Sequence, residues 1–342
     1  MSADRAAPRV AVVGAGLAGL ACAQALQADG VSVRVLEKSR GPAGRMSTRR
    51  DEGWQCDHGA QYFTARDPDF RAEVARWCAD GVAARWDGRI RAVDADGLRT
   101  PDPSLERFVG VPKMTAPAAY LAASLEVVAQ CEIRELRRDP DGWRLRDATS
   151  GWLSDAFDAV VLAVPGPQAA ALVSGHAPAL ARLAGGAPMR GAWAVMLRYD
   201  APVPLPFDGA FVNHGPLRWV ARDSSKPGRS QLETWLLHAT PEWSASRLEH
   251  PAEQVAAELI DAFAVLGAPR PSAWTAHRWR YADTEPPLGQ GCAWDADMAI
   301  GLCGDWLDAG KVEGAWRSGR LLAQRVGGVL SGRAATSGSA AD

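Results

Sequence analysis

Near the start of the chain, two apolar segments flank a short glycine-rich turn. Residues 10–13 are four consecutive apolar residues, which is typical of a parallel strand buried on both faces. The mostly apolar stretch 17–28 predicts a helix, and residues 32–36 predict a second strand. The pattern therefore predicts a strand–turn–helix–strand unit at the start of an α/β sheet.

The turn has the spacing G-x-G-x-x-G at Gly14, Gly16 and Gly19. The first glycine permits a tight turn, the second lets the backbone approach a pyrophosphate, and the third lets the helix pack close to the strand. The helix N-terminus then directs unpaired N–H groups at that pyrophosphate. Glu37 ends the second strand, where a carboxylate accepts hydrogen bonds from the hydroxyls of an adenosine ribose. Together these features predict a dinucleotide-binding site.

The loop G-P-A-G-R-M-S-T-R-R at 41–50 favours FAD over NAD as the bound nucleotide. Gly41, Gly44 and Arg45 follow directly after the ribose-binding acid, which fits a second approach of the backbone to the cofactor phosphates. Many flavoproteins cover an extended FAD with a loop of this kind, whereas ordinary NAD dehydrogenases do not continue in this way.

A third motif near the C-terminus supports the same choice. A short apolar strand reaches Gly304 and Asp305, and a helix is predicted from about 312 to 330. Asp305 is expected to bind the pyrophosphate–ribityl region of FAD. The helix N-terminus is expected to face the flavin edge where negative charge collects on reduction. The tail at 332–342 has low complexity and is expected to be disordered.

Between these motifs, the pattern predicts elements of both types. Residues 65–112 predict a helix and then short strands, and a pair of strands is expected to turn at 139–142. Residues 157–172 predict a buried strand followed by a helix. From 168 to 288, tryptophans alternate with β-type runs, which indicates a mixed sheet that forms a substrate domain.

Within that block, the segment H-R-W-R-Y-A places an imidazole, an indole and a guanidinium close together. On a strand, His277 and Trp279 share one face, and Arg278 and Arg280 share the other. The first pair suits a planar ligand, although a strand covered by salt bridges explains the same residues.

Composition and charge narrow the function classes. The 342 residues are 47% hydrophobic and 23% charged, with a net charge of −2, which argues against nucleic-acid binding. The six cysteines show no C-x-x-C pair, and the histidines no metal-binding spacing, so reduced thiols in a cytoplasmic protein without a metal are expected. The apolar run at 10–26 carries Gln24 and three glycines, and is expected to be a buried strand and helix, not a membrane span.

Several segments together resemble the renalase family of FAD-dependent oxidoreductases, in its bacterial branch. The family run K-S-R-G-x-G-G-R-M-[AS]-T-R-R followed by D-H-G-A-Q-Y-F-T is matched over 38–41, 44–50 and 57–64, and departs at Ala43, where the family usually has glycine. Further similarities lie within the substrate block and beyond it, at 218–229, 235–244, 276–282 and 303–319. The resemblance covers nearly all of 8–330.

This resemblance implies a function. Members of the family hold FAD non-covalently and oxidise the 2- and 6-dihydro isomers of NAD(P) back to NAD(P)+. Bacterial members favour the unphosphorylated dinucleotides and reoxidise the flavin with O2, which releases H2O2. Hydride transfer to the flavin needs stacking and orientation and no acid–base pair, because the pyridinium product is already stable.

The expected architecture is an α/β fold in which a Rossmann-type FAD-binding domain is interleaved with a mixed-sheet α+β substrate domain. This is the topology of p-hydroxybenzoate hydroxylase and the amine oxidases. The FAD-binding domain is expected at 8–66, 113–167 and 289–331, and the substrate domain at 67–112 and 168–288.

The candidate site residues fall into two groups. Those expected to bind FAD are Gly14, Ala15, Gly16, Leu17, Ala18, Gly19, Glu37, Lys38, Gly44, Arg45, Met46, Gln61, Gly304, Asp305, Val312, Glu313, Gly314 and Ala315. Those expected on the substrate side are Tyr62, His277, Trp279 and Arg280, while the flavin carries the chemistry.

Three other functions fit the same motifs. A flavin amine oxidase shares the fold and usually has an aromatic cage that faces the flavin. An aromatic hydroxylase of similar topology would oxidise NADPH rapidly only with its aromatic substrate present. A non-enzymatic flavin-binding sensor would bind FAD and turn over neither a dinucleotide nor an amine.

Overall fold

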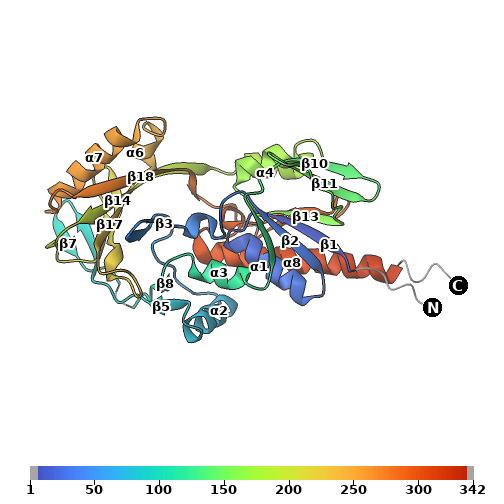
Figure 1. The fold of residues 1–342 in the computed structure, drawn as a ribbon, viewed down its shortest axis with the longest axis horizontal. Helices are drawn as coiled ribbons and strands as arrows, with labels where there is room; N and C mark the ends of the chain where they lie inside the picture. Colours follow the sequence, from blue (N-terminus) through green and yellow to red (C-terminus); the bar gives the residue numbers. More distant parts are fainter. Residues whose placement is uncertain (1–6, 103, 337–342) are drawn as a thin grey trace. The chain divides into compact units, whose positions relative to one another are not determined.

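The computed structural model describes residues 7–102 and 104–336. Their contacts divide the chain into two units, which are interleaved along the sequence (Figure 1). The first unit consists of Met1–Gly44, Ala118–Met189 and Thr284–Asp342, as far as these are described. The second unit consists of Arg45–Pro117 and Arg190–Asp283.

A six-stranded sheet with the order β19-β20-β13-β1-β2-β9 forms the centre of the first unit. Neighbouring strands from β20 to β9 are parallel, and the edge strand β19 runs antiparallel to β20. The strands are β1 (Arg9–Val13), β2 (Ser32–Glu37), β9 (Glu126–Ala129), β13 (Ala159–Leu162), β19 (Ala293–Asp295) and β20 (Ile300–Leu302). The central strands β1 and β13 are almost fully buried, as their unbroken apolar runs predict.

Helices α1 (Leu17–Ala28) and α8 (Lys311–Thr336) pack against each other in this unit. A Cβ atom on Gly319 of α8 would lie 2.1 Å from the carbonyl oxygen of Ala18, so a glycine is needed for the two helices to approach this closely. The other elements in or bordering this unit are α3 (Ala116–Ala122), β10 (Ile133–Asp139), β11 (Gly142–Asp147), β12 (Gly151–Trp152), α4 (Gly166–Val173), α5 (Pro178–Gly185) and the 3₁₀ turn η3 (Asp305–Leu307).

The second unit is built on a seven-stranded mixed sheet with the order β18-β14-β17-β16-β15-β6-β7. Strands β15 and β6 pair in parallel, whereas β14, β17, β16 and β15 form an antiparallel series. The strands are β6 (Ile90–Asp94), β7 (Gly97–Arg99), β14 (Met189–Tyr199), β15 (Gly209–Val212), β16 (Leu217–Arg222), β17 (Glu233–Ala239) and β18 (Ala273–Thr284).

The two faces of this sheet have different partners. On one face, residues such as Val195 and Leu237 pack against helix α7 (Ala252–Val265). On the other face, the alternate residues Met196 and Leu236 pack against the hairpin of β3 (Thr48–Asp51) and β4 (Trp54–Asp57). The remaining elements are η1 (Gly44–Met46), α2 (Pro68–Ala79), β5 (Ala83–Arg85), β8 (Phe108–Gly110), η2 (Asp223–Ser225) and α6 (Pro241–Ala245).

The segments with clear periodicity have the predicted structure. Residues 17–28 form α1, β10 and β11 turn between Asp139 and Gly142, and β13 is followed by α4. One expectation was wrong: α8 continues to Thr336, so residues 332–336 are helical. The sequence pattern also did not predict β9. Residues 337–342, the rest of the expected disordered tail, lie outside the described residues.

The units also differ from the expected domain boundaries. Residues 45–66 lie in the second unit, because the β3–β4 hairpin packs on its sheet through Trp54 and Cys56. Residues 168–189 lie in the first unit, because α4 and α5 pack into the same core as β10 and β13. Within the part of the chain that the structure describes, no helix is long and apolar enough to cross a membrane.

Candidate functional site

The glycine turn after β1 has the geometry that a nucleotide site requires. Gly14 has φ +103°, and a Cβ atom there would lie 2.6 Å from the carbonyl oxygen of Ala163. A Cβ atom on Gly19 would lie 2.0 Å from the carbonyl oxygen of Gly14, so this glycine lets α1 approach the turn. A Cβ atom on Gly16 would meet no atom within 4 Å. The turn is therefore closed toward the protein at Gly14 and Gly19 and open at Gly16.

The Glu37 carboxylate lies beside this turn at the end of β2. Oε2 accepts a hydrogen bond from the N–H of Ala15 at 2.8 Å, and Oε1 accepts one from Ser39 at 2.7 Å. These bonds hold the carboxylate against the turn, with 6% of the residue exposed. No side chain caps α1 at Gly16, so the helix N-terminus keeps backbone donors for an anionic ligand.

The 41–46 loop packs against the same turn. The N–H of Ala43 donates to the carbonyl oxygen of Ala15 at 2.9 Å, and a Cβ atom on Gly44 would lie 3.4 Å from Cα of Gly16. Ala43 has φ +114°, a backbone conformation that favours glycine and that strains any other residue. Ala43, which replaces the glycine usual in the renalase run, therefore still has a backbone conformation that favours glycine.

The C-terminal motif reaches the same edge of the first unit's sheet. Because β1, β2 and β20 are parallel, the residues that follow their carboxyl ends lie at one edge. The N–H of Gly304 donates to Ser318 Oγ at 2.9 Å, and Ser318 Oγ donates to the carbonyl oxygen of Gly291 at 2.5 Å. Asp305 is 8% exposed, and α8 begins at Lys311, one residue before the predicted start.

A group of aromatic and imidazole rings lies on the hairpin side of the second unit's sheet. The ring centroids of His58 and Trp279 are 5.2 Å apart and nearly parallel, and His277 lies edge-on to both, at 4.7 Å from His58 and 4.4 Å from Trp279. The carbonyl oxygen of His58 accepts hydrogen bonds from Trp279 Nε1 at 2.9 Å and from His238 Nε2 at 3.1 Å. We call His58, His238, His277 and Trp279 the ring cluster.

The imidazoles of the ring cluster are neutral at neutral pH. Burial, and then the neighbouring His277 and Arg49, lower the pKa of His58 to about 3. Burial lowers the pKa of His238 to about 4, and burial with the charge of Arg49 lowers the pKa of His277 to about 4. These rings therefore present apolar faces and neutral nitrogens to a ligand.

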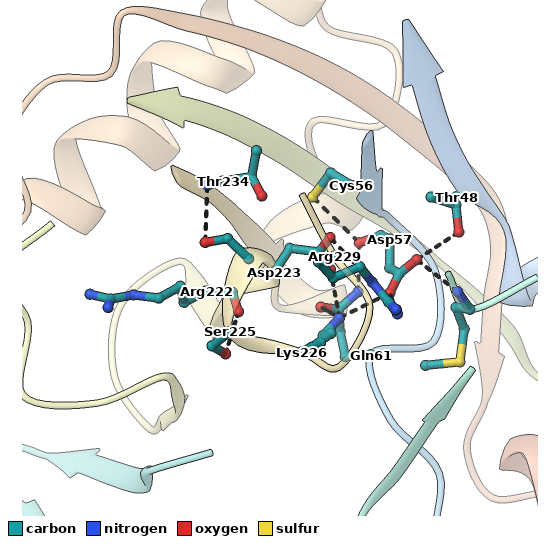
Figure 2. A network of polar contacts seen from close by, with 12 residues as sticks. Thr48, Cys56, Asp57, Gln61, Arg222, Asp223, Ser225, Lys226, Arg229 and Thr234 are labelled. Carbon is teal, nitrogen blue, oxygen red and sulfur yellow. Dashed lines mark hydrogen bonds and ion pairs between the residues drawn. The ribbon is translucent and has the colours of Figure 1, made fainter. Parts of the chain in front are cut away.

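Asp57, the residue before His58, belongs to a buried network of charged side chains, which Figure 2 shows. Asp57 Oδ2 accepts from Lys226 Nζ at 3.3 Å and from Arg229 Nη2 at 2.5 Å. Lys226 Nζ also donates to Asp223 Oδ1 at 2.8 Å and to Gln61 Oε1 at 3.1 Å. Both cations and both carboxylates have side chains that are at most 1% exposed. We call Asp57, Asp223, Lys226 and Arg229 the buried ion cluster.

The two carboxylates of this cluster differ in proton affinity. Burial alone would raise the pKa of Asp57, but the charges of Lys226 and Arg229 hold it below its ordinary value. Asp57 Oδ1 is also hydrogen-bonded by Thr48 Oγ1 at 2.6 Å and by the N–H of Met114 at 3.0 Å. Burial, and then the Asp57 charge, raise the pKa of Asp223 to about 6.

Comparison with known proteins identifies the family. Residues 12–77 match the NAD(P)-binding Rossmann-like domain, and residues 93–327 match the flavin-containing amine oxidoreductase model. The second match covers more than half of the chain. The chain belongs to the flavin-containing amine oxidoreductase family.

Solved structures share this fold. Cyclohexylamine oxidase from Brevibacterium oxydans IH-35A is similar with a TM-score of 0.72 and 14% sequence identity, over 95% of this chain and 100% of the other. Wild-type putrescine oxidase bound to putrescine is similar with a TM-score of 0.68 and 15% identity, over 94% and 99% of the two chains. The predicted fold class is confirmed.

Among curated proteins, the bifunctional tRNA 5-methylaminomethyl-2-thiouridine biosynthesis protein of Magnetococcus marinus is 30% identical over 199 residues. That match covers 45% of this chain and 29% of the relative. The chain spans less than a third of the length of the curated relatives it matches.

The cofactor of this flavin oxidoreductase is FAD, as predicted. The first unit fits it. At one edge of the sheet, the open side at Gly16 leaves room for the cofactor, and the uncapped N-terminus of α1 offers backbone N–H donors. The Glu37 carboxylate offers an acceptor for the ribose hydroxyls. The other expected FAD residues of this unit, namely Leu17, Ala18, Lys38, Val312, Glu313, Gly314 and Ala315, lie in the first turn of α1, after Glu37 and at the start of α8.

The second unit holds the other expected residues in different surroundings. The Gln61 amide lies within the network under His58 and donates to the carbonyl oxygens of Asp57 and Gly59. Arg45 Nη1 contacts the carbonyl oxygen of Ala282 at 3.3 Å, and Met46 is buried. Their expected roles toward the flavin stay predictions.

The four substrate-side candidates do not form one group. His277 and Trp279 share a face and contact each other, as predicted from the strand pattern. Arg280 is on the opposite face in an exposed ion pair with Glu249 at 2.6 Å. Tyr62 packs near Trp219, at a distance of 5.5 Å between ring centroids, and within the described residues it makes no ring contact with His277 or Trp279.

Sequence analysis did not assign roles to His58, His238 or the buried ion cluster. Two motifs could have indicated these residues. D-H-G-A-Q contains Asp57 and His58, and S-S-K-P-G-R contains Lys226 and Arg229. Their partnership was not predictable, since it joins residues 169 and 172 positions apart.

Proposed function

We propose that this flavin oxidoreductase oxidises the 2- and 6-dihydro isomers of NAD(P) to NAD(P)+ and reduces O2 to H2O2, with FAD held non-covalently. A hydride, which is two electrons and a proton, leaves the dihydronicotinamide ring. With one further proton from water, the two electrons convert O2 to H2O2. When bound, FAD would supply the hydride acceptor and the redox chemistry that links this oxidation to O2.

The observation that carries this proposal is the neutral ring cluster. A planar indole and imidazoles suit stacking against a nicotinamide ring. Within the described residues, no carboxylate hydrogen-bonds to the three imidazoles, and Asp57, next to His58 in sequence, is neutralised by Lys226 and Arg229. A site for a cationic amine would gain from a negative charge, which this group does not offer.

The residues of the cluster would act by binding and orientation. Trp279 Nε1 and His238 Nε2 both fix the backbone carbonyl of His58, and the ion cluster fixes Asp57 on the preceding residue. The His58 ring is thus held on two sides. Because the pyridinium product forms without loss of a proton to a base, neutral imidazoles of low pKa suffice.

Anaerobic stopped-flow measurement of flavin bleaching tests the function. The protein is mixed separately with 6-dihydroNAD, 2-dihydroNAD, ordinary NADH and a panel of amines. Fast bleaching by the 2- or 6-isomers, with slow or no bleaching by NADH, and H2O2 after admission of air, is the expected result. Absence of bleaching by every dinucleotide would contradict the proposal.

Amine oxidation is the second candidate, because the chain belongs to the amine oxidoreductase family and shares the fold of two amine oxidases. The same experiment separates the two functions. Bleaching by one of the amines and by no dihydronicotinamide would establish this second function in place of the first.

A further inference from the structure

Among the residues that the structure describes, Arg49 is a cation without a partner at the ring cluster. It lies on β3, opposite Cys56 of β4, and Ser47 precedes it by two residues. Ser47 Oγ contacts His58 Nε2 at 3.2 Å, and residues two apart on an extended segment share a face. The Arg49 side chain is therefore on the side of His58. Its positive charge also reaches His277, since it contributes to the low pKa of both imidazoles.

The surroundings of Arg49 lack a counter-charge. Within residues 7–102 and 104–336, no ion pair or hydrogen bond holds its guanidinium, and Nε is buried without an acceptor. Other arginines of this unit do have carboxylates: Arg229 pairs with Asp57, and Arg278 and Arg280 pair with Glu249. A buried guanidinium donor without an acceptor is unfavourable, and an anionic ligand would supply the acceptor and the counter-charge.

We propose that Arg49 is a specificity-determining residue that binds the phosphate on the nicotinamide-bearing ribose of the substrate. This inference rests on the proposed function for the identity of the ring, and on Arg49 for the anion. A guanidinium presents paired donors that match phosphate oxygens, and it is permanently charged. The ring cluster then selects the planar ring, while Arg49 selects the phosphate on the ribose that carries this ring.

Equilibrium binding to the FAD-loaded protein tests this assignment without turnover. The probes are nicotinamide mononucleotide, which has one phosphate, and nicotinamide riboside, which has none, each titrated by calorimetry. Wild-type protein is expected to bind the mononucleotide more tightly. Arg49→Met is expected to weaken mononucleotide binding by about 10- to 100-fold and to leave riboside binding unchanged, as loss of a charged hydrogen bond predicts. Arg49→Lys should retain part of the preference.

The matched control is Arg50→Met on the neighbouring residue, whose side chain is exposed. It is expected to leave both dissociation constants unchanged. Equal binding of the two probes by wild-type protein, or equal weakening of both by Arg49→Met, would overturn the inference. These oxidised probes report only on binding. The proposed function is tested separately, and it would be contradicted if no dihydronicotinamide bleached the flavin.

Discussion

The nucleotide-binding edge of the first unit and the ring cluster of the second unit are built in opposite ways. At the edge, backbone atoms form most of the site. Gly14, Gly16 and Gly19 leave space because they have no side chain, and the N-terminus of α1 offers backbone N–H donors. At the ring cluster, the surface is defined by side chains from β17 and β18 and by His58, which directly follows β4. Asp57 connects His58 to a network of buried charges.

The difference has physical consequences. A backbone site depends on short spacings within one segment, and it tolerates changes in side chains that point away from the ligand. The ring cluster depends on residues that are distant in sequence. It also depends on the buried ion cluster, in which each charge must be neutralised by another side chain because water is excluded. Mutations should therefore separate cofactor retention from folding in the first unit, and should disturb both together in the second.

Removal of one cation from the buried ion cluster is the strongest test. Lys226→Met keeps the length of the side chain but leaves Asp223 and Asp57 with one buried cation fewer. The free energy of unfolding is expected to fall by about 3–5 kcal/mol, because an uncompensated charge stays buried. Urea unfolding at pH 7 measures it. Arg280→Met, which breaks an exposed ion pair, is the control and should change stability little; a loss of similar size there would contradict the distinction.

Two glycines of one motif should respond differently to the same methyl group. Gly19→Ala brings Cβ against the carbonyl oxygen of Gly14 and is expected to reduce the free energy of unfolding by about 1–3 kcal/mol. Gly16→Ala meets no protein atom, so stability should stay within about 0.5 kcal/mol while bound FAD per chain decreases. Unfolding of the FAD-free proteins and flavin absorbance after gel filtration measure the two effects. Equal stability of the two variants would be inconsistent with the close approach at Gly19.

The raised pKa of Asp223 predicts a pH dependence. Asp223 has a pKa of about 6 in the folded protein against an ordinary value of 3.8, so the folded state holds its proton more tightly. Its contribution to stability is therefore greatest below about pH 4 and is lost as the pH rises to about 6. Relative to Asp223→Asn, wild-type stability should decline by about 1–3 kcal/mol over that range. Urea unfolding of both proteins at several pH values tests this; a constant difference between them would argue for an ordinary pKa.

The smallest effect is expected at Ala43. Its φ of +114° strains an alanine, so Ala43→Gly should raise the free energy of unfolding by up to about 1 kcal/mol, after the greater freedom of glycine in the unfolded chain is included. Thermal unfolding measures the change, and Ala43→Val is the opposing control, which should destabilise. A lower melting temperature for the glycine variant would show that no strain is relieved.

The contrast between the units also explains what the sequence predicts. Local spacing predicted β1, α1, β2 and the turn between them, because each depends on neighbours within about 30 residues. The short amphipathic strand β9 gave no clear signal, since it lies at the edge of the sheet and three of its four residues are exposed.

The ring cluster could be predicted only in part. Alternation along β18 placed His277 and Trp279 together, but nothing in that strand indicates that His58 stacks on Trp279. The position of Gln61 was also not predictable, because its amide is fixed by Lys226, which comes from a distant segment. Pairings of this kind follow from tertiary packing, and a single sequence contains no periodic signal for them.

The order of strands in the first unit has a consequence for the growing chain. Strand β13 lies between β1 and β20, and α1 packs on α8. Segments from the two ends of the described chain therefore belong to the same sheet and the same helix pair. During synthesis, β1, α1 and β2 are made before β13, which pairs with β1. Strand β13 then lacks its other neighbour β20, and α1 lacks α8, until residues 300–336 have been made. The second unit ends at Asp283, and its segments can therefore all be present before the cofactor-binding unit is complete. A complete FAD site is therefore expected only after α8 has been made, although the glycine motif that begins the site is made long before it.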